Sequence, residues 1–452
     1  MTEQLKLKLN DSKATRWGAL VIVAFTMMAA YYVNDVVAPL KTMLETDLAW
    51  SSTDFGFFTG GYSFLNVFFL MLIWGGLILD RFGIRFTGKL ATILMVGGTA
   101  LEYYAMTGLA GADATLFGIN EIFGYKTGVF VAFAGYSIFG VGAEVAGITV
   151  SKIIAKWFKG KELATAMGVQ VALARIGSQA GYAVAIPLAR AFGISTPVLL
   201  GLVLLLGGMI AFFIFAVMDK KLDKQMEAAA IAAGTEDEEE KFSFKDVKNI
   251  LVNPGFWLIA LLCVLFYSCV FPFQKFASEL MIIKYGINEN VAGTFAGLPA
   301  LGALILTPVF GGFIDKRGKS ASIMLLGSAM LICVHFIYAI PDINYWLVAI
   351  VLMIILGIAF SLVPSAMWPA VAKIFPVSQL GTAYALIFFI QNIGLWGIPT
   401  LIGWVLDAYC ISGKKPDGTN MYDYTVPMCI FTSIACLMVR TLIIAALSVL
   451  IL

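Results

Sequence analysis

Charged residues and histidine are both scarce in this 452-residue sequence. Asp, Glu, Lys and Arg make up 13% of the chain, against roughly 25% in soluble domains, so they cannot cover a large water-exposed surface. The chain has one histidine, no HExxH motif and no GxSxG motif with triad partners, so it lacks the residues of the common hydrolase sites. We therefore expect no enzymatic activity and no cofactor.

Cysteine is also sparse, and its spacing predicts no metal site. The six cysteines show no CxxC pair and lie mostly inside apolar runs, so we interpret them as small core residues: Cys263, Cys269, Cys333, Cys410, Cys429 and Cys436. The net charge of +2 indicates no basic surface for nucleic acid, because the Lys and Arg residues are spread over the loops.

Long apolar runs are abundant, and hydrophobic residues make up 60% of the chain. The runs approach the roughly 20 residues that an α-helix needs to cross a ~30 Å hydrocarbon core. They must be helices, because lipid offers no partner to open backbone groups. Twelve segments are predicted, at residues 16–39, 54–78, 87–108, 127–149, 163–188, 195–218, 255–274, 291–313, 319–340, 345–366, 381–404 and 426–450.

The Lys and Arg residues concentrate in alternate loops, which predicts the orientation of the chain. Basic groups such as Arg85, Lys156 and Lys316 fall on the same side as both termini, and the positive-inside rule places that side in the cytoplasm. Residues 1–16 are polar and lead into a full-length span, so we expect no cleavable signal peptide. A bacterial inner membrane protein with both termini in the cytoplasm fits this distribution.

The longest polar stretch, 219–249, contains the acidic run 236–240 and lies near the middle of the chain. We interpret it as a solvated cytoplasmic linker. It divides the chain into an N-terminal six-helix bundle, 1–218, and a C-terminal six-helix bundle, 250–452.

The two halves repeat each other in two places. GLILDRFGIR at 76–85 matches GGFIDKRGK at 311–319, and KWFKGKELATA at 156–166 matches KIFPVSQLGTA at 373–383. Each match joins corresponding loops, so the chain is a duplication of six plus six helices. This is the architecture of alternating-access carriers, whose substrate site lies at the midplane between the halves.

The first repeat also suggests a gate. Its glycines, Gly76 and Gly311, would let helix backbones approach closely, and its Asp residues could stabilise a neighbouring helix N-terminus. A contact of this kind holds one conformation and must break in the other. We therefore assign gating, rather than substrate binding, to Gly76, Asp80, Arg81, Gly83, Arg85, Asp315, Lys316 and Gly318.

With this pattern the sequence resembles the major facilitator superfamily, whose loop between helices 2 and 3 carries it and whose loop between helices 8 and 9 repeats it more weakly. The resemblance covers the whole chain. It implies the major facilitator fold, an all-α membrane protein with two pseudo-symmetric six-helix bundles. One departure is Tyr136, which stands where many members have an arginine early in helix 4 and so weakens any inference of proton coupling.

Further blocks resemble the family of lysosomal dipeptide uniporters of animals and their microbial relatives. They lie at 142–144, 157–163, 174–178, 270–273, 368–369, 379–384 and 391–392. This resemblance implies transport of small peptides, dipeptides above all, by uniport. No acidic dileucine signal stands near the N-terminus and no N-x-S/T sequon falls on an outside loop, so we expect a bacterial inner membrane rather than a lysosome.

Ionisable residues inside the predicted spans are candidate site residues, because each costs free energy unless it faces a cavity or a partner. There are six: Asp35, Glu102, Glu144, Arg175, His335 and Arg440. In the superfamily, helices 1, 4, 7 and 10 line the cavity with 2, 5, 8 and 11 beside them, which selects Asp35, Glu144 and Arg175. For the other three we expect structural partners.

Glu144 and Arg175 are opposite charges on adjacent predicted helices. A zwitterionic peptide offers an ammonium group and a carboxylate, and a guanidinium can bind the carboxylate bidentately. The alternative is that the two side chains pair only with each other. Asn392 stands at the position of the second half that corresponds to Arg175, so that half would contribute a neutral amide.

Aromatic and amide residues on helices 1, 7, 10 and 11 could complete a pocket that tolerates many side chains: Tyr31, Tyr32, Tyr267, Phe271, Phe273, Trp368, Gln391 and Asn392. Each aromatic could equally serve helix packing.

Small peptides are thus the predicted substrate, the bilayer is the predicted surrounding, and we expect a monomer. A proton-coupled carrier of another organic anion or amino acid is the alternative function.

Overall fold

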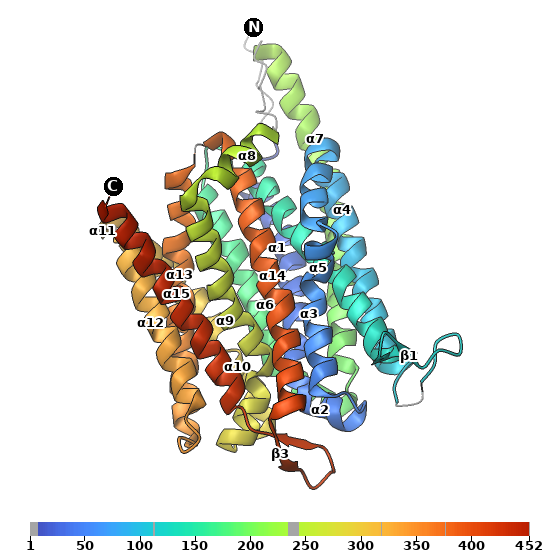
Figure 1. The fold of residues 1–452 in the computed structure, drawn as a ribbon. Helices are drawn as coiled ribbons and strands as arrows, with labels where there is room; N and C mark the ends of the chain where they lie inside the picture. The colour runs from blue at the N-terminus through green and yellow to red at the C-terminus, as the bar shows by residue number, and fades with distance from the viewer. Residues whose placement is uncertain (1–7, 112–113, 234–243, 318, 376, 452) are drawn as a thin grey trace.

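The computed structural model describes residues 8–111, 114–233, 244–317, 319–375 and 377–451, and most of them are helical (Figure 1). The first half contains α1 (Lys13–Val36), η1 (Ala38–Leu40), α2 (Lys41–Asp47), α3 (Ser52–Phe68), α4 (Met71–Thr107), β1 (Glu121–Ile122), β2 (Tyr125–Lys126), α5 (Thr127–Trp157), α6 (Leu163–Phe192) and α7 (Thr196–Ala233).

The second half begins after the linker. It contains α8 (Phe244–Val252), α9 (Pro254–Tyr285), α10 (Glu289–Ala296), α11 (Leu298–Arg317), α12 (Ser320–Ala339), α13 (Trp346–Ile374), α14 (Val377–Tyr409), β3 (Ile411–Lys414), β4 (Asn420–Tyr422) and α15 (Thr425–Ile451). The strands form two small antiparallel hairpins, β1–β2 and β3–β4.

Each of the twelve predicted segments corresponds to helix in the structure. Among the described residues, nine helices are long and apolar enough to cross a membrane, or ten if the bent pair α3 and α4 is one span. The number is below twelve because α4 covers the end of the second predicted segment and all of the third, with a break at Gly83, and because α6 carries the polar residues Gln170, Arg175 and Gln179.

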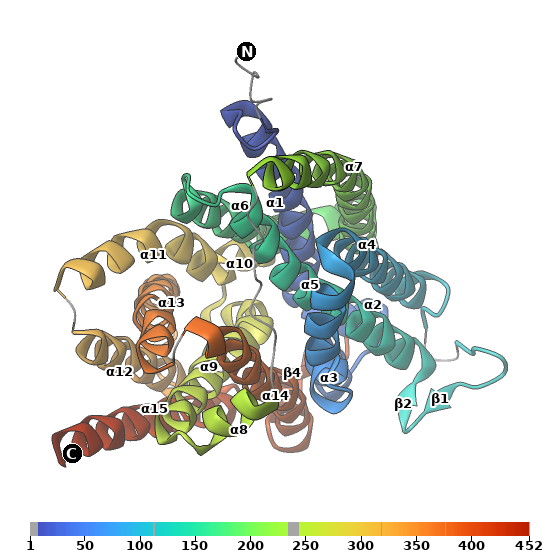
Figure 2. The same cartoon turned by 90° about the horizontal axis from the view of Figure 1, so that it is seen from above.

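The helices pack as two bundles. In the first, α1 lies against α6 and α7, and α4 lies against α5 and α7; in the second, α9 lies against α14 and α15, and α12 against α13 and α15. The bundles meet where α3 crosses α14 and where α6 contacts α10 and α11 (Figure 2). The exact limits of the two halves, 1–218 and 250–452, stay a prediction.

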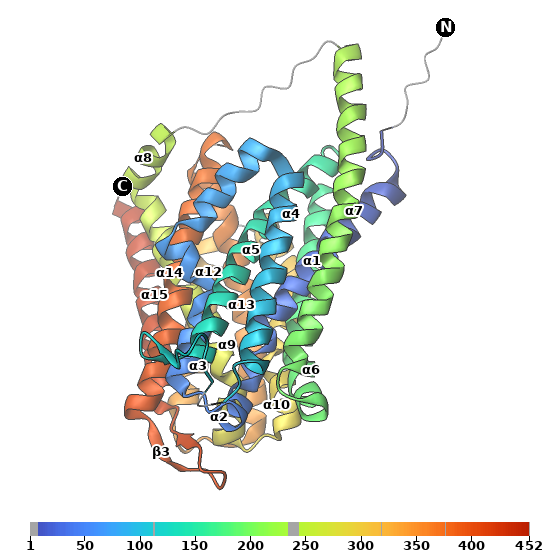
Figure 3. The ribbon, with the colours of Figure 1, turned by 90° about the vertical axis from the view of Figure 1, so that its right-hand side faces the viewer.

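The two ends of the bundle differ. The start of α1, the end of α7 and α8 lie at one end, which we call the linker end (Figure 3). At the other, α2 and the β3–β4 hairpin lie together, and we call it the hairpin end (Figure 1). The sequence predicts that the linker end faces the cytoplasm.

Two expectations need correction, on the seventh span and on the cysteines. The seventh span does not end at residue 274, because α9 continues to Tyr285. Part of the predicted linker is helical: α7 extends to Ala233 and α8 begins at Phe244. Cys333, Cys429 and Cys436 are exposed rather than buried in the core, because they lie on the outward sides of α12 and α15.

Candidate functional site

Glu144 is positioned by a close approach of α3 to α5. A Cβ added at Gly140 would lie 2.0 Å from the carbonyl oxygen of Tyr62, so only glycine permits this contact. The approach brings the Tyr62 hydroxyl to 3.0 Å from the Glu144 carboxylate, to which it donates a hydrogen bond. The Glu144 carboxyl group is thereby oriented by a neutral donor rather than by a cation.

Arg175 lies between aromatic rings from both halves of the protein. Its guanidinium carbon is 5.5 Å from the centre of the Tyr31 ring and 4.9 Å from the centre of the Phe360 ring. Both distances are typical of cation–π contacts. Gly177, two residues further along α6, lets α6 approach α1 closely, because an added Cβ there would lie 2.1 Å from the Met28 carbonyl oxygen of α1.

Glu144 and Arg175 form no ion pair with each other among the described residues, although both lie within electrostatic range of the Tyr31 hydroxyl. The two charges are therefore held separately, one by a tyrosine hydroxyl and one by two rings. This arrangement leaves both charged groups able to bind opposite ends of a polar solute.

An aromatic cluster from α9, α13 and α14 faces this pair. Tyr267 stacks on Phe271 at 5.5 Å and contacts Trp368 at 6.4 Å, and Phe271 meets Phe360 edge to face at 5.4 Å. Phe388 extends the cluster through Trp368. The structure thus brings together the predicted residues Tyr267, Phe271 and Trp368. It adds Phe360, which gave no signal in the sequence because it lies in an unbroken apolar run.

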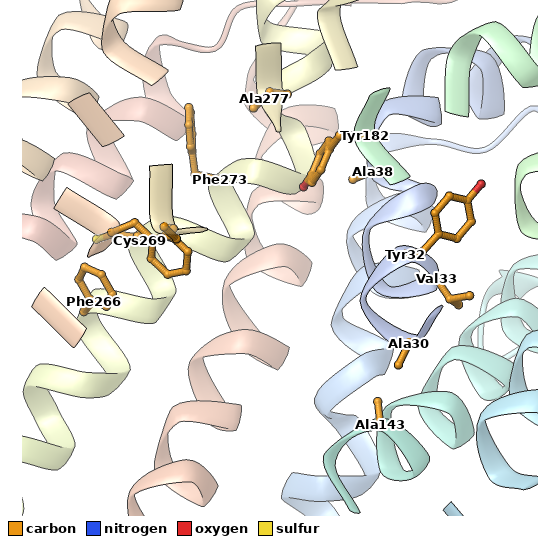
Figure 4. Packing of buried hydrophobic residues seen from close by; sticks show 14 of the residues in the cluster. Ala30, Tyr32, Val33, Ala38, Ala143, Tyr182, Phe266, Cys269, Phe273 and Ala277 are labelled. Carbon is orange, nitrogen blue, oxygen red and sulfur yellow. The ribbon is translucent and has the colours of Figure 1, made fainter. Parts of the chain in front are cut away.

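Two predicted aromatic residues lie elsewhere. Phe273 packs against His335 and Phe431 on the opposite face of α9, because two residues along a helix turn a side chain by roughly 200° from Phe271. Tyr32 is buried, and its hydroxyl donates a hydrogen bond to the carbonyl oxygen of Pro197. Figure 4 shows both within the buried hydrophobic packing and outside the aromatic cluster, so their role in substrate binding stays a prediction.

The two predicted amides are buried on α14. Gln391 contacts the Cys263 thiol at 3.4 Å, and the Asn392 amide donates to its own helix at the Phe388 carbonyl oxygen. The side-chain oxygen of Asn392 has no hydrogen-bond partner among the described residues.

Asp35 does not face the Glu144–Arg175 pair as a free charge. Its carboxylate forms an ion pair with Lys275 of the second half, with Nζ 3.0 Å from Oδ1. The same ammonium also donates to the Asn34 carbonyl oxygen at 2.5 Å and lies 3.4 Å from the Tyr136 hydroxyl. Asp35 therefore joins the two halves near the hairpin end, and its role in substrate binding stays a prediction.

A second set of charges joins the halves at the hairpin end. Lys41 lies 2.5 Å from Glu45 of its own half and 2.5 Å from Glu279 of the other, and all three side chains are buried. Lys415 balances the charge, at 3.5 Å from Glu45 and 3.8 Å from Glu279, and the Tyr424 hydroxyl donates to Glu279. We call these five residues the gate network. Sequence reasoning missed it because Glu279 falls between the predicted seventh and eighth spans and its partners are far away in the sequence.

A tight helix crossing reinforces this closure. A Cβ added at Gly56 of α3 would lie 2.5 Å from the Pro399 carbonyl oxygen, and one at Gly403 of α14 would lie 2.3 Å from the Ser52 carbonyl oxygen. Asp407 then accepts hydrogen bonds from the backbone N–H groups of Ser52 and Thr53 at the start of α3. A carboxylate at a helix N-terminus is stabilised by the free N–H groups there.

The predicted gating residues lie at the linker end. Asp80 pairs with Lys152 at 3.0 Å, and Arg85 pairs with Asp223 at 2.7 Å, both within the first half. Gly83 has φ of 73° and makes the turn that breaks α4, and the Arg81 guanidinium lies over the Phe82 ring.

The second copy of the gating motif lies at the end of α11 and is described in part. Lys316 is exposed on the last turn of α11, while the Asp315 side chain and Gly318 lie outside the described residues. A Cβ at Gly76 or Gly311 would meet nothing within 4 Å, so the expected close helix contact is absent from these two positions. The close contact is made instead by Gly75, where a Cβ would lie 2.4 Å from Val145.

The three remaining ionisable residues of the spans, for which we expected structural partners, lie on α4, α12 and α15. Glu102 and His335 are fully buried, and neither has a hydrogen-bond partner among the described residues. His335 stacks on Phe431 instead. Arg440 is exposed on α15, an outer helix of the second bundle.

Two helical bundles with charged groups and aromatic rings at their interface define a multi-pass membrane transporter rather than an enzyme. The chain belongs to the Major Facilitator Superfamily, whose family model matches residues 20–397. It is 29% identical over 409 residues to the human lysosomal dipeptide transporter MFSD1, an alignment that covers 87% of this chain and 81% of the human protein.

Solved structures agree on the fold. The nucleoside transporter NupG superposes with a TM-score of 0.69 at 12% identity, covering 94% of this chain and 98% of its own. A D-xylose–proton symporter superposes with a TM-score of 0.67 at 15% identity, and the superposition covers 94% of this chain and 97% of the symporter.

Proposed function

We propose that the chain carries dipeptides by uniport, with Glu144 binding the peptide ammonium group and Arg175 its carboxylate. The observation that carries this proposal is that the two charges are separately held and not paired with each other. The relatives named as dipeptide transporters support the substrate class.

The surroundings of the two charges suit such a substrate. A guanidinium binds a carboxylate through two parallel hydrogen bonds, and the flanking rings of Tyr31 and Phe360 leave its edge free to do so. The aromatic cluster of the second half offers flat apolar surface that accepts different side chains. Selectivity would thus come from the peptide ends, and tolerance from the cluster.

Alternating access requires that the hairpin end open. The Asp35–Lys275 pair, the gate network and the crossing of α3 with α14 must then separate together. The gate network contains one Lys and one Glu from each half, and opening would break the Lys41–Glu279 and Lys415–Glu45 pairs that cross between the halves. At the linker end, the motif around Asp80 and Asp315 would form the second gate.

We further propose that the carrier is a monomer in a bacterial inner membrane, with both termini in the cytoplasm.

Uptake into proteoliposomes tests the proposal. A panel of dipeptides should compete with a labelled dipeptide, while free monocarboxylates and dicarboxylates should not. Counterflow should occur without a pH gradient, as uniport requires. Accumulation of a dipeptide against its gradient, driven by an imposed proton gradient alone, would refute uniport. Competition by organic anions but not by peptides would favour the alternative carrier.

A further inference from the structure

The loop between α4 and α5 contains two tight turns of the same kind. In the first, Phe117 and Gly118 have φ of 54° and 80° between the paired residues Leu116 and Ile119. In the second, Phe123 and Gly124 have φ of 52° and 80° between the paired residues Ile122 and Tyr125. Positive φ at both central residues defines a type I′ turn.

Phenylalanine is an unusual residue for these positions. The first central residue of a type I′ turn is normally Asn, Asp or Gly, because a bulky side chain is strained in the left-handed region. The chain places a phenylalanine there twice, and the two side chains are 95% and 88% exposed. Both strain and exposure oppose this arrangement in water, so the rings require an apolar surrounding that the protein itself does not supply.

The position of the loop indicates what that surrounding is. The β1–β2 hairpin projects sideways from the adjoining ends of α4 and α5, away from the bundle, whereas β3–β4 continues along the bundle axis (Figures 1 and 2). The Lys126 ammonium fixes its base by donating to the Ala49 carbonyl oxygen. A loop that projects sideways from membrane-spanning helices near their ends lies over the lipid headgroups.

The rings also continue a row of aromatic side chains in the spans. Phe123 lies 5.9 Å from Phe130, which lies 6.0 Å from Phe133. From there contacts run through Phe64 to Phe68, an exposed side chain of α3. Phe133 is itself buried, so these contacts tie the base of the hairpin to the packing of α3 and α5 and leave its two turns projecting outward.

We propose that Phe117 and Phe123 insert into the interfacial region of the leaflet at the hairpin end and anchor the loop to phospholipid. The polar residues Asn120 and Glu121 lie between the two turns and remain at the headgroup level. Burial of two aromatic rings among acyl chains offsets the strain of the turns. The ligand is the bilayer itself, and the anchor is independent of which solute the carrier moves.

Tryptophan substitution with lipid quenching tests this proposal. Phe117→Trp and Phe123→Trp are prepared separately in full-length protein and placed in nanodiscs of phosphatidylcholine brominated near the headgroup or of the unbrominated lipid. The emission of unsubstituted protein, with its nine tryptophans, is subtracted. The control is Asp417→Trp, in the turn of the β3–β4 hairpin that follows the bundle axis.

We expect the difference emission of both Phe variants to be blue-shifted, quenched at least two-fold by the brominated lipid and little affected by acrylamide, with the reverse for Asp417→Trp. Red-shifted emission that acrylamide quenches at both positions would overturn the proposal, as would shielding that appears only when a second protein is added. If the Phe variants fold poorly, Ile119→Trp between the two turns takes their place, with the same expected and contradicting results.

Discussion

Lys275 of α9 and Asp35 of α1 form an ion pair that links the two halves of the carrier, with 3.0 Å between Nζ and Oδ1. Both side chains are nearly buried, and the ammonium also binds the Asn34 carbonyl oxygen. The pair crosses between the halves in this structure, so it stabilises the closed arrangement of the hairpin end against separation of the halves.

Breaking this pair should favour opening of the hairpin end. Asp35→Asn or Lys275→Gln leaves one buried charge unpaired, which typically costs about 3–5 kcal/mol, whereas removal of both charges costs less. Each single variant should therefore melt at a lower temperature in nanodiscs, and Asp35→Asn/Lys275→Gln should recover most of the loss. Strictly additive effects in this double-mutant cycle would show that the pair is not coupled.

The crossing of α3 with α14 gives a steric test of the same closure. Gly56→Ala adds a methyl group only 2.5 Å from the Pro399 carbonyl oxygen, which is too close for a van der Waals contact. The halves should therefore be pushed apart at the hairpin end. In a background without native cysteines, Thr400→Cys should then react faster with an impermeant thiol reagent, and transport should slow. The control is Gly397→Ala on α14, because a Cβ at Gly397 would meet nothing within 4 Å. Equal labelling in the two variants would contradict this account.

The start of the chain is held at the linker end by two ion pairs that respond to pH. A hydrogen bond from Lys161 lowers the pKa of Asp11, and hydrogen bonds from Arg16 lower the pKa of Glu162. Both carboxyl groups have depressed folded-state pKa values, so their contribution is present above the unfolded pKa of about 4 and is lost as pH falls through the lower folded values.

Residues 8–16 should therefore stay docked at neutral pH and be released only in strong acid. A spin label at the exposed position Ala14 should report low mobility from pH 8 to about pH 5 and increasing mobility below about pH 4. Arg16→Gln should give the mobile spectrum at neutral pH. A mobility transition centred near pH 6.5 in unsubstituted protein would point to a different group.

The fold could be predicted from the sequence because its two strongest signals, apolar length and internal repetition, are properties of whole segments. The end of α9 could not be predicted, since Lys275 and Glu279 interrupt the apolar run. These two side chains are buried only because opposite charges from the other half, Asp35 and Lys41, pair with them. Partners hundreds of residues apart leave no local pattern. The charges of Lys275 and Glu279 therefore predicted a loop after residue 274.

The candidate site could be predicted in part for the same reason. Glu144 and Arg175 stand out because a charge inside a span is rare and costly. Phe360 and Tyr62 do not stand out, because an aromatic residue in an apolar helix has no distinguishing signal until its neighbour is known. Phe273 was assigned to the site as an aromatic residue of the predicted seventh helix, but the helical period places it on a different face from Phe271.

The last prediction separates binding by Glu144 and Arg175 from a structural role. Arg175→Ala should lose affinity for dipeptides with a free C-terminus, while amidated peptides should already bind the unsubstituted protein poorly and change little. Glu144→Gln should likewise lose affinity for peptides with a free amine but not for N-acetylated ones. Both losses should reach at least ten-fold, since a hydrogen bond to a charged group contributes about 1.5–3 kcal/mol. Affinity and melting temperature are measured together, with Arg440→Ala as a control, because that arginine is exposed on the outer helix α15. If both single variants misfold while Glu144→Gln/Arg175→Gln folds and transports, the charges are structural and the peptide binds elsewhere.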